Sequence, residues 1–273
     1  MSERLTGTKP KSDRLSILLS NDDGIGAPGI WDLYGELSKI AAVVVSAPER
    51  EQSGVGHAFT FNTPLHYERQ NLPNCPEAFM VWGTPVDCVK FGISFLLQER
   101  PDAVVAGINA GENSGLSAFY SGTVAAAREG AFWNIPSFAF SICKGGEHYR
   151  SRYAAVAADL LQYLLACERT KENHRVYYNI NFPPCSPEEC RGIKVTSQSM
   201  AFFDDRYETI DVESHRTKKG YVIYGDKMDI EASDDYDSRA LISRYIAVTP
   251  LSFDATAHRH LECLHGIEDV KLS

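Results

Sequence analysis

The sequence predicts an α/β fold, a doubly wound and mostly parallel sheet followed by a β-rich C-terminal extension. Its short apolar runs are continuous rather than alternating, as strands buried on both faces must be. Segments of helical period separate these runs up to about residue 184, which predicts right-handed crossover connections between parallel strands. Beyond residue 185 strand-like runs follow one another without a long helix between them. This loss of the alternation between strands and helices divides the chain into a core and an extension.

The predicted core, residues 14–184, contains five buried strands: LSILLS (15–20), AAVVVSA (41–47), AVVAGI (103–108), SFAFSI (137–142) and VYYNINF (176–182). Four segments between them have helical character, namely residues 29–40, 85–98, 121–132 and 152–169. Pro85 suits the first turn of the second helix. Ser121 is the N-cap candidate of the third helix.

The regions outside the core are predicted separately. Residues 1–13 are polar and are expected to form a flexible tail. Residues 185–273 form the β-rich extension, with strands in GIKVTSQS, GYVIYGD and RYIAVTPLSF. Strands without covering helices leave unpaired edges. The apolar run 221–224 therefore predicts a hairpin arm exchanged between subunits.

Composition excludes several classes of protein. The 273 residues carry 27 basic and 36 acidic side chains, a net charge of −9, which argues against binding to duplex nucleic acid. No run approaches the roughly 18 apolar residues of a membrane span. The N-terminal segment lacks the apolar stretch of a signal peptide. Seven scattered cysteines without a C-x-x-C pair indicate neither a zinc ribbon nor a thioredoxin motif, and we expect a cytoplasmic protein.

The turn after the first strand, SNDDGIGAPGI, supports conflicting interpretations. Gly24, Gly26 and Gly29 satisfy G-x-G-x-x-G, and Glu49 follows about 20 residues later, as in a dinucleotide site. However, the adjacent carboxylates of residues 22–23 precede the glycines and would repel a pyrophosphate. The turn could also be structural, with an aspartate capping the following helix.

A metal site is the interpretation that the neighbouring loops favour. Asp22 and Asp23 end the first strand, Ser53 lies in the loop after the second, and Asn109 follows the strand at 103–108. The carboxyl ends of parallel strands meet at one edge of a sheet, where ligands bind. Carboxylate, hydroxyl and amide oxygens suit a hard cation such as Mg²⁺ or Mn²⁺.

A phosphate site is indicated by YSGTVAAAREG. Ser121, Gly122 and Thr123 open a helix, where free amides, hydroxyls and the positive end of the dipole can hold phosphate. A plain capped helix is the alternative. A carboxylate-bound metal beside such a cradle suggests hydrolysis of a phosphate ester.

The segments LLSNDDGIGAPGI, SAPEREQSG, GTPVDCV, INAGENSG, YSGTVAAAREG and NINFP occur in one order over residues 15–184. In order and spacing they resemble the SurE family of stationary-phase survival proteins, which are metal-dependent 5′-nucleotidases. The resemblance continues more weakly through GIKVTS and YIAVTPL. It implies a Rossmann-like core, a β extension that joins subunits into homodimers or homotetramers, and hydrolysis of nucleoside 5′-monophosphates. It also implies activity on 3′-nucleotides and short polyphosphate.

The resemblance carries over to single residues. It implies one divalent cation, Mg²⁺ or Mn²⁺, per subunit, with the ligands Asp22, Asp23, Ser53 and Asn109. It implies that the phosphate is lined by Asn113, Ser121, Gly122 and Thr123. Three residues depart from the family pattern, namely Ile25, His57 and Glu112. His57 could contact substrate or be a bystander, and the departures leave the base and sugar preference open.

We therefore expect a divalent-metal-dependent phosphatase of nucleoside monophosphates. Asp22 is the candidate base that accepts the proton of the attacking water. Asn113 is expected to stabilise the developing negative charge. Two alternatives stay open at this point: a non-catalytic nucleotide-binding regulator, and an NAD-binding oxidoreductase.

Overall fold

The structure is a computed structural model that describes residues 14–168, 176–212, 219–261, 263 and 267–268. The predicted flexible tail, residues 1–13, lies outside the described residues. Nine strands form one sheet in the order β3-β4-β2-β1-β5-β6-β7-β11-β8. The five strands predicted for the core are confirmed as β1 (Leu15–Ser20), β2 (Ala41–Pro48), β5 (Ala103–Ala110), β6 (Ser137–Ile142) and β7 (Val176–Phe182).

A hairpin missing from the sequence prediction extends the sheet beyond β2. It consists of β3 (Tyr67–Leu72) and β4 (Cys75–Val81). β4 pairs in parallel with β2, whereas β3 is antiparallel to β4 and forms the sheet edge. The sequence of β3, YERQNL, is polar because most of its residues are exposed, so it lacks the apolar run that marked the other strands.

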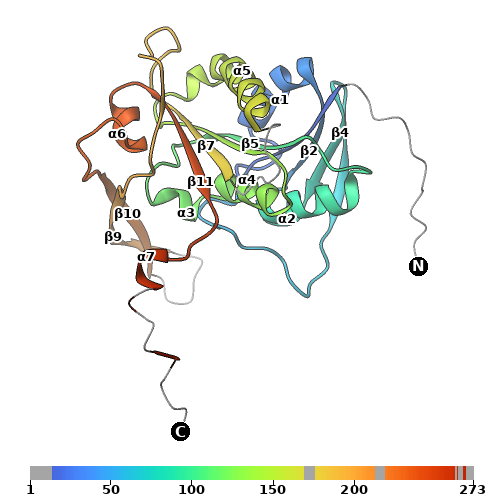
Figure 1. Cartoon of the computed structure of the whole chain (residues 1–273). Helices are drawn as coiled ribbons and strands as arrows, with labels where there is room; N and C mark the ends of the chain where they lie inside the picture. The colour runs from blue at the N-terminus through green and yellow to red at the C-terminus, as the bar shows by residue number, and fades with distance from the viewer. Residues whose placement is uncertain (1–13, 169–175, 213–218, 262, 264–266, 269–273) are drawn as a thin grey trace.

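Helices cover both faces of the sheet, as the doubly wound class requires. Figure 1 shows α1 (Pro28–Ile40) beside α5 (Arg150–Glu168) on one face, and α2 (Pro85–Phe91) beside α4 (Gly122–Phe132) on the other. The second predicted helix changes form after Phe91 and continues as a π-helix over Gly92–Leu96. Parallel strands in the centre and helices on both sides confirm the predicted fold class.

Backbone geometry explains two of the three glycines in the first turn. Gly24 has a φ of +93°, a conformation that L side chains rarely adopt. Gly29 lies so close to β5 that a Cβ atom would stand 2.0 Å from the carbonyl oxygen of Ile108. The pattern G-x-G-x-x-G therefore arises from a tight turn and from the close contact between α1 and β5.

The C-terminal region contributes to the main sheet and also forms a separate ribbon. β8 (Ile193–Val195) and β11 (Ile246–Ser252) add to the sheet beyond β7, with β11 antiparallel to β7. β9 (Phe202–Asp211) and β10 (Lys219–Met228) form the two-stranded antiparallel ribbon, away from the sheet in Figure 1. The boundary at residues 184/185 stays a prediction.

Short helices complete the chain: α3 (Ser117–Tyr120), the 3₁₀ turn Glu147–Tyr149, α6 (Asp237–Ile242) and α7 (His258–Leu261). In the part of the chain that the structure describes, no helix combines the length and apolar character needed to cross a bilayer.

Candidate active site

Asp22 brings together two segments that are about 100 residues apart in the sequence. It lies two residues after the end of β1, and the residue is only 4% exposed. Its carboxylate accepts hydrogen bonds from the backbone N–H of Gly122, at 3.1 Å, and from the hydroxyl of Thr123. Ser121 caps α4 by accepting a bond from the N–H of Val124 at 3.1 Å. The predicted metal turn and the predicted phosphate cradle are thus in direct contact.

Asp23 contacts the last residue of β5. One of its carboxylate oxygens accepts a hydrogen bond of 3.3 Å from the backbone N–H of Ala110. The neighbouring Asn109 donates its side-chain N–H to the carbonyl oxygen of Gly111 at 2.6 Å, so its amide nitrogen is turned into its own loop. Asp23 and Asn109 therefore lie at the same edge of the sheet, as the sequence predicts.

The loop after β2 is joined to the same edge by its backbone. The N–H of Gln52 donates to the carbonyl oxygen of Asp22 at 2.8 Å, and that of Gly56 donates to Tyr120 at 2.9 Å. Ser53, between these anchors, is exposed and donates its hydroxyl to Glu51 at 2.6 Å. Its role as a metal ligand stays a prediction.

The electrostatics of the turn fit a bound cation. Burial raises the pKa of Asp22, against the opposing effect of its hydrogen bonds from Thr123 and Gly122. Burial, followed by the nearby charge of Asp22, raises the pKa of Asp23 to about 6. Two adjacent, poorly solvated carboxylates repel one another, and a divalent cation relieves that repulsion.

The donor set is limited to oxygen. No cluster of three or more His, Cys, Asp or Glu side chains capable of holding a metal occurs among the described residues. A cation held by Asp22 and Asp23 would therefore need hydroxyl, amide or water oxygens to complete its coordination. This requirement agrees with the inclusion of a serine and an asparagine in the predicted ligand set.

Asn113 is held by hydrogen bonds to buried polar side chains of β6 and β7. Its side-chain N–H donates to the hydroxyl of Ser141 on β6, and its backbone N–H to the amide oxygen of Asn181 on β7, both at 2.8 Å. Asn179, also on β7, donates to the carbonyl oxygen of Asn113 at 2.7 Å. These bonds fix the loop that carries Asn113. Its predicted role at the phosphate is not tested by them.

A buried glutamate that the sequence reasoning missed anchors the loop that carries Ser53. Glu129 of α4 is 3% exposed and contacts His57 at 3.0 Å, Lys90 at 3.1 Å and Trp133 at 2.8 Å. Burial acts to raise the pKa of Glu129, but the hydrogen bonds from these partners outweigh it and the pKa is lowered. Arg128 donates to the other ring nitrogen of His57, at 3.1 Å. His57 thus belongs to a structural network, and a charged residue within the small-residue run VAAAREGA is the signal that could have revealed it.

Comparison with known proteins identifies the family. A family model described as survival protein SurE matches residues 17–205. The chain belongs to the SurE family. A 5′-nucleotidase SurE 1 from Thermus thermophilus is 41% identical over 260 residues, which cover 93% of this chain and 98% of the relative.

Further relatives extend the match over most of the chain. A 5′-nucleotidase SurE from Flavobacterium psychrophilum is 35% identical over 259 residues, covering 92% of this chain and 96% of the relative. The crystal structure of a SurE protein from Aquifex aeolicus superposes with a TM-score of 0.78 at 36% identity, covering 93% of this chain and all of that one. The SurE fold therefore includes the C-terminal region as well as the core.

Proposed function

We propose that this SurE protein is a divalent-metal-dependent phosphatase that hydrolyses nucleoside 5′-monophosphates to nucleoside and phosphate. 3′-Nucleotides and short polyphosphate are further candidate substrates. The names of the relatives support the activity, and the oxygen donors at the end of β1 support the metal. The buried free thiols of Cys75, Cys88 and Cys143 suit a reducing compartment, and we place the protein in the cytoplasm.

One observation carries the proposal, the contact of Asp22 with Gly122 and Thr123. It sets a cation-binding carboxylate against the N-terminus of α4, where backbone amides and the helix dipole favour an anion. A phosphate ester is the ligand that can use both halves at once. A carboxylate site for a cation alone, or a helix N-terminus alone, would not point to a phosphate ester.

The residues divide the chemistry between them. Asp22 and Asp23, with Ser53 and Asn109, would hold one Mg²⁺ or Mn²⁺, which supplies Lewis acidity and neutralises phosphate charge when bound. The donors of Ser121, Gly122 and Thr123 orient the phosphate. Asn113 stabilises the charge that develops on its oxygens, and Asp22 accepts the proton of the attacking water. These four roles account for the site residues expected from the sequence.

The alternatives differ in what they would do with a nucleotide. An NAD-binding oxidoreductase is not favoured, since backbone packing accounts for Gly24 and Gly29 and the relatives are nucleotidases. A regulator that had lost turnover would bind AMP without releasing phosphate.

A phosphate-release panel tests the proposed function. Purified protein is incubated with 5′- and 3′-nucleoside monophosphates and with tripolyphosphate, each with Mg²⁺ or Mn²⁺. We expect the fastest release from a 5′-monophosphate. AMP that binds in equilibrium dialysis but yields no phosphate with either metal would instead identify the regulator.

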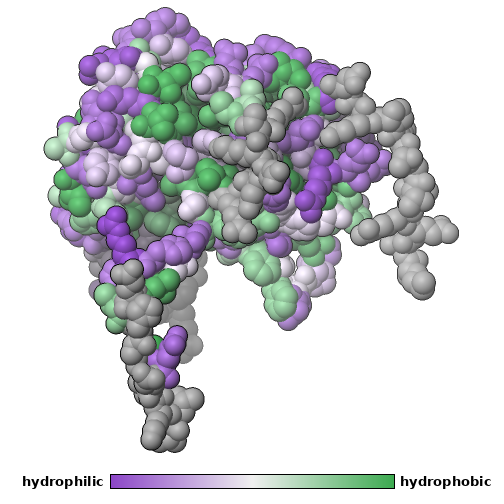
Figure 2. All heavy atoms as spheres, viewed as in Figure 1, coloured by the Kyte–Doolittle hydropathy of each residue, from purple (hydrophilic) through white to green (hydrophobic). Residues whose placement is uncertain are grey.

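The β9–β10 ribbon is proposed to join subunits into a homodimer or homotetramer. Tyr207, Tyr221 and Ile223 share one face of the ribbon by register, and each is at least half exposed. Figure 2 shows green, hydrophobic side chains among purple, hydrophilic ones at the lower left, where Figure 1 places the ribbon. Apolar side chains in such a position are typical of an interface between subunits.

Deleting residues 212–232, which include all of β10, is expected to give a smaller species while the metal turn stays folded. Replacing Tyr207, Tyr221 and Ile223 by serine tests the same face without removing the backbone. Sedimentation velocity at micromolar concentration measures the outcome, with Glu208→Gln on the opposite face as the control. A full-length protein that sediments as a monomer would contradict the arm hypothesis.

A further inference from the structure

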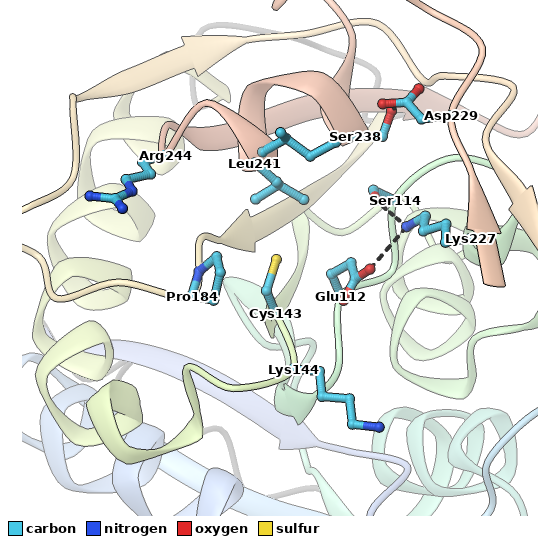
Figure 3. Close-up of a pocket in the computed structure, with 11 residues that line it drawn as sticks. Glu112, Ser114, Cys143, Lys144, Pro184, Lys227, Asp229, Ser238, Leu241 and Arg244 are labelled. Atoms are coloured by element: carbon cyan, nitrogen blue, oxygen red, sulfur yellow. Dashed lines mark hydrogen bonds and ion pairs between the residues drawn. The ribbon is translucent and has the colours of Figure 1, made fainter.

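A cavity of about 440 Å³ opens beyond the loop that carries Asn113. One wall follows the carboxyl ends of β5, β6 and β7 and is made by Glu112, Ser114, Cys143, Lys144 and Pro184. The other wall comes from the end of β10 and from the region of α6, with Lys227, Asp229 and Leu241 among its residues (Figure 3). Its volume lies within the range of roughly 300–1,000 Å³ usual for small-molecule sites.

The cavity and the candidate active site share one loop. Ala110, at the end of β5, is hydrogen-bonded to Asp23, whereas Glu112 and Ser114, on either side of Asn113, line the cavity. The three residues from Asn109 to Glu112 can span at most about 10 Å. The loop that carries Asn113 therefore borders both the candidate active site and the cavity.

Lys227 holds the loop from the opposite wall. Its ammonium group donates to the carboxylate of Glu112 at 3.1 Å and to the hydroxyl of Ser114 at 2.6 Å (Figure 3). The side chains of Lys227 and Glu112 are only 19% and 23% exposed, so the pair is partly shielded from water. A carboxylate has about four acceptor positions, and Lys227 occupies one of them in Glu112.

The lining of the cavity offers an apolar surface and hydrogen-bond acceptors to the alcohol product of the reaction. Leu241, Ile242 and Pro184 supply an apolar surface for a ring. The lining also carries three cations, Lys144, Lys227 and Arg244, and two carboxylates, Glu112 and Asp229. The carboxylates can accept hydrogen bonds from hydroxyl groups. In dinucleotide-binding folds a carboxylate accepts the hydrogen bond of a ribose 2′-hydroxyl in this way.

We propose that this cavity is the nucleoside subsite, and that Glu112, positioned by Lys227, accepts a hydrogen bond from the ribose 2′-hydroxyl. The inference rests on the proposed function and adds sugar selection to it. Ribonucleotides are hydrolysed in preference to 2′-deoxyribonucleotides because only they offer Glu112 the hydroxyl.

Paired substrates test the sugar selection. The ratio of kcat/KM for AMP to that for dAMP is expected to be roughly ten or more, the scale of one hydrogen bond to a charged group. Glu112→Ala brings the ratio close to one, whereas Glu68→Ala, an exposed carboxylate on β3 at the opposite edge of the sheet, retains it. Lys227→Met lowers the ratio by releasing Glu112, and Lys227→Arg restores it in part. A wild-type ratio near one, or a ratio unchanged by Glu112→Ala, overturns the proposal.

A binding measurement separates this inference from the proposed function. Calorimetric titration of chelator-treated protein with adenosine and 2′-deoxyadenosine requires neither metal nor turnover. We expect tighter binding of adenosine, loss of that preference in Glu112→Ala, and weak binding of both nucleosides to Ile242→Trp, whose exposed side chain would fill the cavity. Equal binding of the two nucleosides overturns the ribose contact. Absence of phosphate release from every nucleotide, with adenosine still preferred, would reject the proposed function and retain the subsite.

Discussion

Removing divalent metal is expected to abolish phosphate release from AMP, and adding Mg²⁺ or Mn²⁺ to restore it. Asp22 and Asp23 place two neighbouring negative charges at this turn, and a bound cation would offset their repulsion of an incoming phosphate. The measurement is phosphate release by protein treated with excess chelator, before and after addition of each metal. Full activity of the chelated protein, with elemental analysis confirming removal, would refute the metal site.

Metal binding can also be followed without turnover. A ligand that binds only the folded state stabilises it by about 2.7 kcal/mol at 100 times its dissociation constant. We therefore expect the midpoint of thermal unfolding to rise with Mg²⁺ or Mn²⁺ concentration. Elemental analysis is expected to give one cation per subunit. A midpoint that is independent of both metals would contradict binding at the turn.

Asp23→Asn is expected to lower turnover at least about 100-fold, the scale of losing one strong electrostatic contribution at a reacting centre. The change preserves the shape of the side chain but removes one negative charge from the candidate metal site. Initial rates should be measured at limiting metal, where weakened binding has its full effect. Asp159→Asn, an exposed carboxylate on α5, is the matched control and should leave the rate unchanged. Near-normal turnover of Asp23→Asn would show that Asp23 is only a turn residue.

The same variant is expected to be more heat-stable than the wild type in the absence of metal. The pKa of Asp23 is raised to about 6 by burial and by the charge of Asp22, so its ionised form destabilises the fold. That penalty is fully present above about pH 6 and declines between pH 6 and the ordinary pKa of 3.8, as Asp23 takes up a proton in the folded state before it would in the unfolded chain. The neutral asparagine of the variant carries no such penalty. In chelator at pH 8, the midpoint of thermal unfolding should therefore be higher for the variant than for the wild type, by roughly 2–4 °C for each kcal/mol of destabilisation removed. At pH 4 the two midpoints should differ little.

The sequence predicted those parts of the fold that are buried on both faces. The strands of the core are continuous apolar runs because helices cover them above and below, and that pattern is readable without a structure. β3 escaped prediction because an exposed edge strand need not be apolar. The position of β11 in the main sheet was also not predicted, because an apolar run alone does not show which strand it will pair with.

The candidate site likewise has parts that the sequence predicted and parts that it did not. The positions of Asp22, Asp23 and Asn109 follow from the rule that parallel strands end at one edge. The contact of Asp22 with Thr123 depends on how α4 docks, and the pairing of Glu112 with Lys227 depends on where a ribbon more than 100 residues later returns to the core. Such long-range placements are set by tertiary packing, which local sequence patterns do not encode.

The hydrogen bonds of Asp22 have a consequence for anion binding at the site. This carboxylate accepts the hydrogen bonds of Gly122 and Thr123, the donors that the proposed function assigns to the phosphate. A phosphate that binds at the N-terminus of α4 would have to share these donors with Asp22 or take its place as their acceptor. The position of one side chain and the occupancy of the anion site would in this way depend on each other.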